Sequence, residues 1–285
     1  MENTFITWQD FVDGFGKEMV SAEDVYNHML NHGLINNSLA QFDYHFISDK
    51  KDNLTDLKAF LVEHYSYQNK KIKNIENGLW ELSGVTNKIP VTQDNLLYWG
   101  LDMYKRGYEY DSKIDGYGAL FDHDNPKLPN LDKSLEDQYF DIAIDEYHKG
   151  NLSGAIINWS LVLEINPKDP NSYYSRGIVK NELYTWKSAL RDYDKAIEIA
   201  PDFMDAFVNR GTLKDENGDF EGAISDYNRV LEFKNIDIEQ KQMIYFNRGN
   251  TKFNMEDKVN ACKDWKTALD LGAVYAKERI DQHCK

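Results

Sequence analysis

The sequence predicts two domains: an α+β sandwich with the element order βαββαβ, followed by an all-α array of antiparallel helix pairs. Three observations support this. In the first half, apolar and polar residues alternate in short segments, as half-buried strands require. In the second half a pattern repeats every 34 residues, with Pro167 and Pro201 at equivalent positions. Between the halves, Pro126–Asn130 contains two prolines and no periodicity, which is typical of a linker.

The sandwich is predicted from hydrophobic periodicity and turn signals. Phe42–Ile47 alternates apolar and polar residues up to Phe46, and Asn77-Gly78 is a strong hairpin signal because both residues accept a positive φ. In chain order we expect strands over Phe42–Ile47, Lys70–Glu76, Leu79–Thr86 and Gly116–Phe121, with helices over Leu54–His64 and Asn95–Arg106. This order suggests a two-layer, ferredoxin-like sandwich.

The repeat in the second half contains small residues in register. One alanine recurs in each of four copies: Ala155, Ala189, Ala223 and Ala261. The phrase Arg-Gly recurs in three copies, at Arg176-Gly177, Arg210-Gly211 and Arg248-Gly249. A small residue lets the two helices of a pair cross closely, since a side chain there would force them apart.

This pattern resembles the tetratricopeptide repeat (TPR), whose unit is two antiparallel helices in 34 residues. The resemblance runs from about Glu136 to the C-terminus and implies a superhelix of four units. Ala273–Cys284 is then the solubilising helix that caps such an array. We therefore expect an N-terminal domain over residues 1–125, a linker over 126–135, and four units with a capping helix over 136–285.

The resemblance implies a binding face on the concave side, formed by the first helix of each unit. The expected protein- or peptide-binding positions are Phe140, Asp141, Ile144, Tyr174, Ser175, Ile178, Val208, Asn209, Thr212, Phe246, Asn247 and Asn250. Solvent-facing aromatic and aliphatic side chains on one groove indicate an interaction surface. The alternative is that some of them pack against the preceding domain or the capping helix.

Charge restricts the class of partner. The formal net charge is −15, so the surface repels phosphate backbones and direct nucleic-acid binding is not expected. TPR co-chaperones resemble each other in a clamp of Lys, Asn and Arg that grips acidic tails. The corresponding positions here hold Phe140, Ile144, Ser175 and Val208, so the clamp is absent. A basic or apolar protein segment suits the groove better.

The first half resembles the RraB family, the protein regulators of ribonuclease E activity. Val25–Gly33 stands where that family has a short helix ending in a Leu-x-x-x-Gly phrase, and Phe42–Asp49 is similar to its first strand. Glu109–Asp111 and, after three further residues, Asp115–Gly118 resemble its Glu-Tyr-Asp-Gly-Trp-Gly phrase. The resemblance implies a small module that modulates a ribonuclease by contact.

The sequence contains no pattern that indicates catalysis, a cofactor or a metal. Phosphate-binding glycine loops, HExxH and GxSxG are missing, and Asp122-His123-Asp124 stands alone at the linker. His45 and His64 are interpreted as residues of the sandwich rather than as an acid/base pair.

Compartment and thiol state follow from the remaining signals. We expect a cytoplasmic protein, because neither a signal peptide nor an apolar run of membrane length is found. Cys284 is expected on the helix after that of Cys262 and could approach it, but a disulfide would imply an oxidising compartment. The two cysteines are therefore predicted to be free thiols, with a disulfide as the alternative.

These features predict a non-enzymatic regulator or adaptor, with the sandwich contacting one protein, such as a ribonuclease, and the groove another. Two alternatives stay open. One is an immunity or antitoxin protein that neutralises a basic toxin, which the acidity favours. The other is a hydrolase with an unrecognised site in the sandwich.

Overall fold

The computed structural model describes residues 3–284, so residues 1, 2 and 285 at the ends of the expected domains lie outside it. The chain forms two compact units. The first runs up to Pro167 and includes Glu182–Tyr184; the second contains Lys168–Asn181 and the chain from Thr185 onward. The first predicted helix pair therefore belongs to the same unit as the sheet, and the expected linker 126–135 lies inside that unit.

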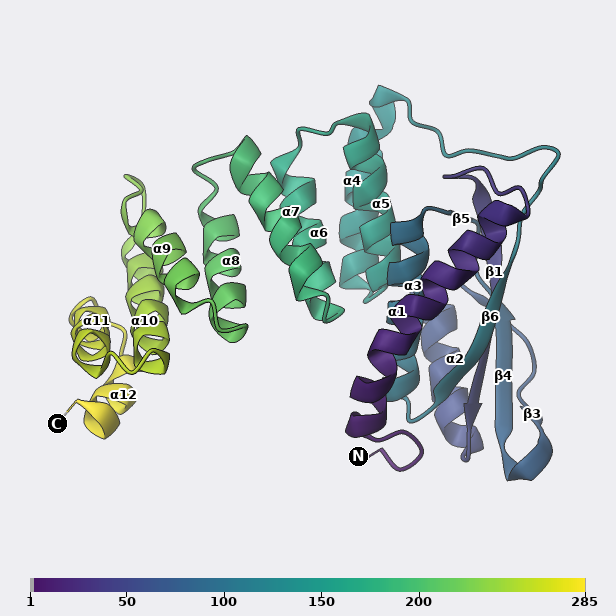
Figure 1. Ribbon diagram of the computed structural model, residues 1–285, viewed down its shortest axis with the longest axis horizontal. Coiled ribbons are helices and arrows are strands. Elements are labelled where there is room, and N and C mark those ends of the chain that lie inside the picture. The colour runs from purple at the N-terminus through teal and green to yellow at the C-terminus, as the bar shows by residue number, and fades with distance from the viewer. Residues whose placement is uncertain (1–2, 285) are drawn as a thin grey trace. The chain divides into compact units, whose positions relative to one another are not determined.

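The first unit is built around an antiparallel sheet (Figure 1). Strand β1 (Leu39–Ser48) is central, and its alternate side chains Phe42, Tyr44 and Phe46 are fully buried, as their spacing predicts. On one side β1 pairs with β4 (Trp80–Val85), which in turn pairs with β2 (Gln68–Asn69) and β3 (Lys73–Asn74). On the other side it pairs with β6 (Lys113–Leu120) and β5 (Ile89–Pro90).

The predicted hairpin turn between the second and third strands is confirmed. Asn77 and Gly78 have φ angles of 62° and 77°, and the backbone N–H of Ile75 donates to the carbonyl of Leu79 over 2.8 Å. A short 3-10 turn, Glu76–Gly78, occupies the tip. The strand before the turn is broken into β2 and β3 instead of running over Lys70–Glu76.

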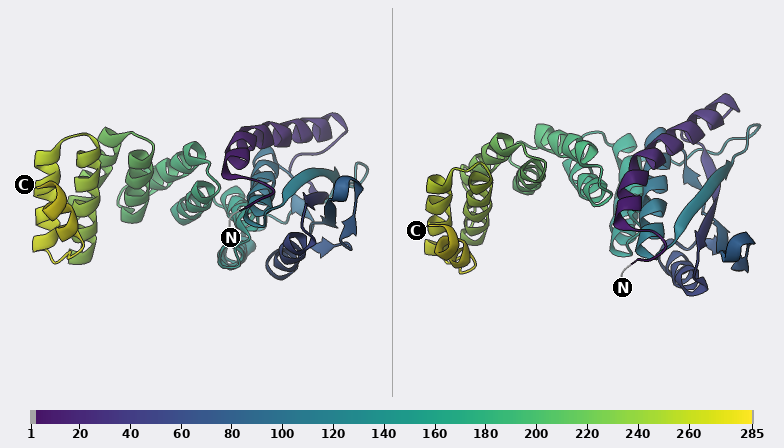
Figure 2. Two further views of the ribbon diagram at one scale, coloured as in Figure 1. Left: turned by 90° about the horizontal axis from the view of Figure 1, so that it is seen from below. Right: turned by 60° about the horizontal axis from the view of Figure 1, so that its bottom comes forward.

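Helices α2 (Lys51–Tyr65) and α3 (Gln93–Glu109) pack on the buried face of this sheet. They contribute Leu54, Leu57 and Leu61 from α2 and Leu96, Trp99 and Met103 from α3. Helix α1 (Trp8–Asn31) packs against α3 (Figure 2), with the rings of Phe11 and Tyr104 stacked 5.1 Å apart. A 3-10 turn at Lys133–Leu135 leads into α4 (Glu136–His148) and α5 (Leu152–Ile165), which complete the unit.

The second unit is helical. It contains, in chain order, α6 (Pro170–Glu182), α7 (Trp186–Ile199), α8 (Met204–Glu216), α9 (Phe220–Leu231), α10 (Ile238–Asn254), α11 (Lys258–Asp270) and α12 (Ala276–His283). The close crossing predicted at the glycines is confirmed. A Cβ at Gly177 would lie 2.8 Å from the ring of Tyr193, and one at Gly249 would lie 2.6 Å from that of Trp265.

The two cysteines form a disulfide, so the prediction of free thiols is wrong. Helix α12 turns back on α11 after Gly272, whose φ of 110° suits the reversal. The Cα atoms of Cys262 and Cys284 are therefore only 5.6 Å apart, within the range that a disulfide spans. The sequence placed the two cysteines on successive helices, but whether they meet depends on how the last helix packs.

Candidate protein-binding surfaces

The predicted face positions of the second unit lie on the first helix of each of its three pairs. They are Tyr174, Ser175 and Ile178 on α6, Val208, Asn209 and Thr212 on α8, and Phe246, Asn247 and Asn250 on α10. All nine are partly exposed and none is buried. A folded chain can therefore offer both apolar and amide groups along these three helices.

Several face residues also bind neighbouring helices. The side-chain amide of Asn209 donates to the hydroxyl of Tyr174 over 3.1 Å, and this links α8 to α6. The indole N–H of Trp265 donates to the side-chain oxygen of Asn250 over 3.1 Å. These contacts hold the side chains of Tyr174, Asn209 and Asn250 in place within the folded unit.

Phe246 shows that part of the expected face is covered. Its ring lies 4.9 Å from that of Tyr275, edge to face, at the start of α12. The apolar surface offered at α10 is thus smaller than the sequence suggests. Packing on the capping helix, which was the alternative for such positions, applies to this residue.

The three remaining predicted positions, Phe140, Asp141 and Ile144, lie on α4 in the first unit. Asp141 is exposed, and Phe140 and Ile144 are partly exposed like the nine positions of the second unit.

A repeated ion cluster, which the sequence analysis missed, lies behind the face in each pair of the second unit. An arginine and a lysine from the first helix share one buried aspartate of the second helix. The three clusters are Arg176, Lys180 and Asp192; Arg210, Lys214 and Asp226; and Arg248, Lys252 and Asp264. The sequence signal was the constant spacing of 16 residues from arginine to aspartate and 12 from lysine to aspartate.

The geometry of these clusters is nearly invariant. The arginine–aspartate distances are 2.8, 2.5 and 2.7 Å, and the lysine–aspartate distances are 2.9, 2.9 and 2.7 Å. Each guanidinium also lies 5.1–5.5 Å from the centre of an aromatic ring three residues earlier. Because each arginine directly follows Ser175, Asn209 or Asn247, the cluster fixes the helix turn that carries a face residue.

The ionisation of Asp192 is set by this environment. Burial raises the pKa of its carboxyl, but the hydrogen bond and charge of Arg176 and the charge of Lys180 outweigh it. The pKa therefore lies below its ordinary value. The carboxylate is charged at neutral pH and holds both cations.

The first helix pair is fixed differently, by a buried network that joins it to α3. The backbone N–H of Ser153, in the first turn of α5, donates to the Asp102 carboxylate over 2.8 Å. Arg106 lies 3.3 Å from the same carboxylate and donates to the carbonyl of Gly150 over 2.6 Å. The Tyr65 hydroxyl donates to Asp102 over 2.9 Å. The sheet domain thereby holds the α4–α5 turn directly.

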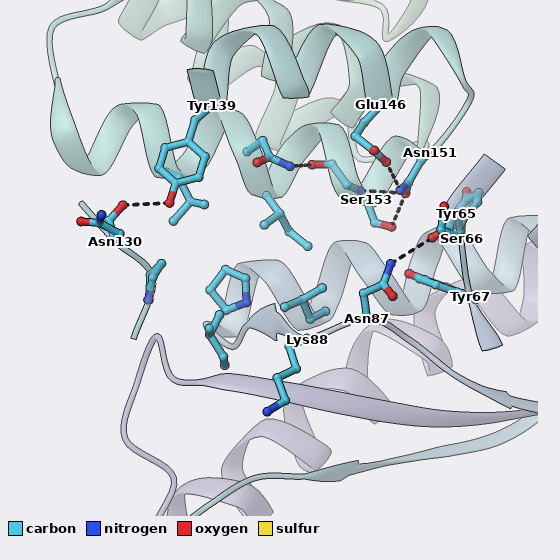
Figure 3. A pocket seen from close by; sticks show the side chains of 18 of the residues that line it. Tyr65, Ser66, Tyr67, Asn87, Lys88, Asn130, Tyr139, Glu146, Asn151 and Ser153 are labelled. Carbon is cyan, nitrogen blue, oxygen red and sulfur yellow. Dashed lines mark hydrogen bonds between the residues drawn. The ribbon is translucent and has the colours of Figure 1, made fainter. Parts of the chain in front are cut away.

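A cleft of about 390 Å³ opens in the first unit between the sheet side and α4–α5 (Figure 3). Its polar side chains largely bind one another. Asn151 donates to Glu146 and accepts the N-cap hydrogen bond from Gly154 over 2.9 Å, while Tyr139 donates to the carbonyl of Asn130 over 2.8 Å. Burial raises the pKa of Glu146. The hydrogen bond from Asn151 lowers this pKa by less, so it stays above its ordinary value. These polar groups of the cleft are hydrogen-bonded to other groups of the protein. We therefore interpret the cleft as a gap in packing rather than as a reactive site.

The other titratable side chains that the sequence singled out contact neighbouring groups of the protein. The Asp122 carboxylate accepts the backbone N–H groups of Asp124 and Asn125, which makes this segment a polar turn. His64 contacts the carbonyl of Lys149 at 2.6 Å, and His45 lies 3.5 Å from Glu81 on the neighbouring strand. Within residues 3–284, three or more side chains of the metal-ligand types never gather closely enough to hold an ion.

Comparison with known proteins identifies the helical part. Residues 205–237 match the family model of the tetratricopeptide repeat, which confirms the prediction of such repeats in this chain. Repeats of this kind mediate protein–protein interaction. Among curated proteins no sequence matches the chain. Within the described part of the chain, no helix has the length and apolarity needed to cross a bilayer.

Solved structures show distant similarity. MamA from Desulfovibrio magneticus RS-1 (residues 41 to the end) is 18% identical, with a TM-score of 0.46 over 53% of this chain and 88% of that one. PilF of Pseudomonas aeruginosa is 19% identical, with a TM-score of 0.44 over 49% and 62%. YrrB, described as a TPR protein with an unusual peptide-binding site, is 19% identical, with a TM-score of 0.45 over 66% and 85%.

Proposed function

We propose that this chain is a non-enzymatic adaptor or regulator that holds a protein or peptide segment on the first helices of its repeats. The observation that carries the proposal is the set of nine partly exposed positions on α6, α8 and α10, each backed by an ion cluster at the same register. Side chains that packing holds in place on rigid helices are pre-organised for recognition.

The chemistry of the face favours a basic or apolar segment. Val208 and Ile178 offer apolar contact, while Ser175 and Asn247 add a partly exposed hydroxyl and a partly exposed amide that can bind a peptide backbone. The chain carries a net charge of −15, which attracts a positively charged segment over long range.

For the sheet domain we propose the ferredoxin-like class and an RraB-like role, in which it modulates a ribonuclease by contact. Support comes from the strand order β6-β1-β4, with β2 and β3 outermost, and from the antiparallel pairing throughout. Together the two modules would bring their partners close to one another.

The test compares proteins that co-purify with the full-length chain and with a face variant, Ile178→Ala/Val208→Ala/Asn247→Ala. A matched control, Ile238→Ala/Val259→Ala/Ser225→Ala, removes two apolar and one polar side chain at exposed positions away from the predicted face. We expect one set of partners to be lost from the face variant and kept by the control. The loss should be about tenfold or more if hot-spot contacts are removed.

Equal recovery of every partner by the two variants would contradict the assignment of the face. Recovery of a ribonuclease by both variants would support the separate role of the sheet domain. If a single basic toxin co-purifies with the chain instead, the result favours an immunity protein over an adaptor.

A further inference from the structure

A hollow on the outer surface of the first unit has a charge opposite to that of the chain as a whole. It has a volume of about 590 Å³ and lies between the exposed side of α2 and the segment that joins β2 to β3. Helix α2 contributes Lys51, Lys58, Ala59 and Val62, and the joining segment contributes Lys71 and Ile72. We call it the lysine hollow.

The floor of the lysine hollow is apolar. The side of α2 that faces the sheet buries Leu54, Leu57 and Leu61, so Val62 is not part of the core and is 50% exposed. Ala59 is exposed beside it, and Ile72 is half-buried opposite. Exposed apolar residues that meet in one depression and are framed by charge mark an interaction site more often than isolated ones do.

The rim is cationic and unneutralised. Among residues 3–284, Lys51, Lys58 and Lys71 form no ion pair with a carboxylate, and no acidic residue lines the hollow. The adjacent lysines differ, since Lys73 binds Glu81 at 3.0 Å and Lys50 lies 3.9 Å from Asp111. An acidic chain thus keeps three free cations around one apolar floor.

Two of the three rim lysines are held in place by uncharged groups. The ammonium of Lys58 donates to the carbonyl of Lys70 over 3.2 Å, and that of Lys51 lies 5.4 Å from the ring centre of Trp80. Contacts of this kind orient the stems without neutralising the charge, so the cations remain able to bind carboxylates.

The sheet also ends beside this hollow. Strands β2 and β3 both pair with β4, and within the described residues no strand lies on their other side. The free edge offers main-chain donors and acceptors to an extended segment, whose side chains would alternate between the hollow and solvent.

We propose that the lysine hollow binds a short acidic segment of a partner protein, with a bulky apolar side chain in the floor and carboxylates at the rim. An anionic membrane or a nucleic acid fits less well, because an extended anionic surface meets the repulsion of the whole chain at −15. A short segment meets the hollow alone, since charges beyond about 8 Å are screened at physiological salt. The inference is independent of the helical face, which favours a segment of opposite charge.

The experiment measures fluorescence anisotropy of a labelled peptide of alternating glutamate and leucine against the full-length protein. We expect saturable binding that weakens about tenfold or more in Lys58→Glu/Lys71→Glu, because two attractive contacts become repulsive. The matched control Lys266→Glu/Lys277→Glu makes the same change in net charge at exposed positions of α11 and α12 and should bind like the parent. Val62→Ala should weaken binding severalfold without a change of charge.

Four results would overturn the proposal. The first is an absence of saturable binding by the parent. The second is equal weakening in the two lysine double variants, and the third is equal binding of a lysine–leucine peptide. The fourth is tighter binding of another occupant that is lost in Lys58→Glu/Lys71→Glu. Such binding of phosphatidylserine vesicles would indicate a membrane. Self-association of the parent, detected by light scattering, would indicate a second copy of the chain.

Discussion

The first helix pair and the three later pairs share a periodic sequence but are stabilised by different interactions. In the later pairs each aspartate of the second helix binds an arginine and a lysine of the first. In the first pair the equivalent positions hold Ile142, Glu146 and Asn158, and no such cluster exists. Helix α5 instead buries Ile156, Trp159 and Leu163 and joins the network of Asp102 and Arg106 on α3.

The difference shows how a repeat can be adapted to end an array. An internal pair meets other repeats, so ion clusters can be repeated unchanged. The first pair meets a sheet domain, and its second helix is accordingly buried more widely. The same helical periodicity thus accompanies a candidate binding surface in the second unit and an attachment to the sheet domain in the first.

The largest effect is expected from Asp102→Ala. Asp102 is fully buried and Arg106 nearly so, and the substitution leaves the guanidinium without its main buried carboxylate. We expect a loss of about 3–5 kcal/mol in the free energy of unfolding of the first unit. Urea titration followed by tryptophan fluorescence measures it. The control Asp145→Ala removes an exposed partner of Lys149, and a cost as large as that of Asp102→Ala would contradict the role of the network.

The opposite end of the helical array is stabilised by a disulfide rather than by a domain. The bond between Cys262 and Cys284 closes a loop with a sequence separation of 22. Cys284→Ser should lower the stability of the second unit by about 3 kcal/mol. Thiol titration of the unfolded parent protein without reductant should find no free thiol. Two free thiols, together with no change in stability for the variant, would show that the bond is not formed.

The ion clusters and the first pair can be compared at equivalent positions. Asp192→Ala leaves Arg176 and the buried Lys180 without their carboxylate, so we expect a loss of about 1.5–3 kcal/mol. Asn158→Ala, at the same register of the first pair, removes one hydrogen bond to the carbonyl of Gly154 and should cost about 1 kcal/mol or less. Equal costs would remove the distinction drawn between the pairs.

The smallest expected effect is a difference in pH dependence. Asp192 has a lowered pKa when folded, so its contribution is present above the ordinary value of 3.8 and is lost as the pH falls through the folded value. Glu146 has a raised pKa when folded, so stability of the first unit falls as the pH rises from 4.5 towards that value. Unfolding titrations of Asp192→Asn and Glu146→Gln should each flatten the corresponding slope. Slopes in both variants that equal the parent's would contradict this assignment.

Much of the fold could be predicted because its signals are local. The 34-residue period places the helix pairs, and Asn77-Gly78 places the hairpin, since both depend on neighbouring residues. The disulfide and the attachment of α5 to α3 could not be predicted, because they join residues that only tertiary packing brings together. The ion clusters were in principle visible in the same alignment as the glycines, through the recurrence of arginine and aspartate.

The repeat predicts which positions form the candidate face, but not which of them are covered by another helix. Spacing alone placed Phe246 on the exposed side of α10, whereas the return of α12 puts Tyr275 against it. The lysine hollow had no sequence signal, because Lys58 and Lys71 meet only when α2 packs beside the strand edge.

Native-state hydrogen exchange of the full-length protein at low urea concentrations tests most directly where the binding array begins. If the first pair is held by the sheet domain, amides of α5 (Leu152–Ile165) will exchange through the same opening reaction as those of β1 and α3. That result would limit the independent array to the three pairs from α6 onward. Exchange of α5 together with α7, α9 and α11 would contradict the account.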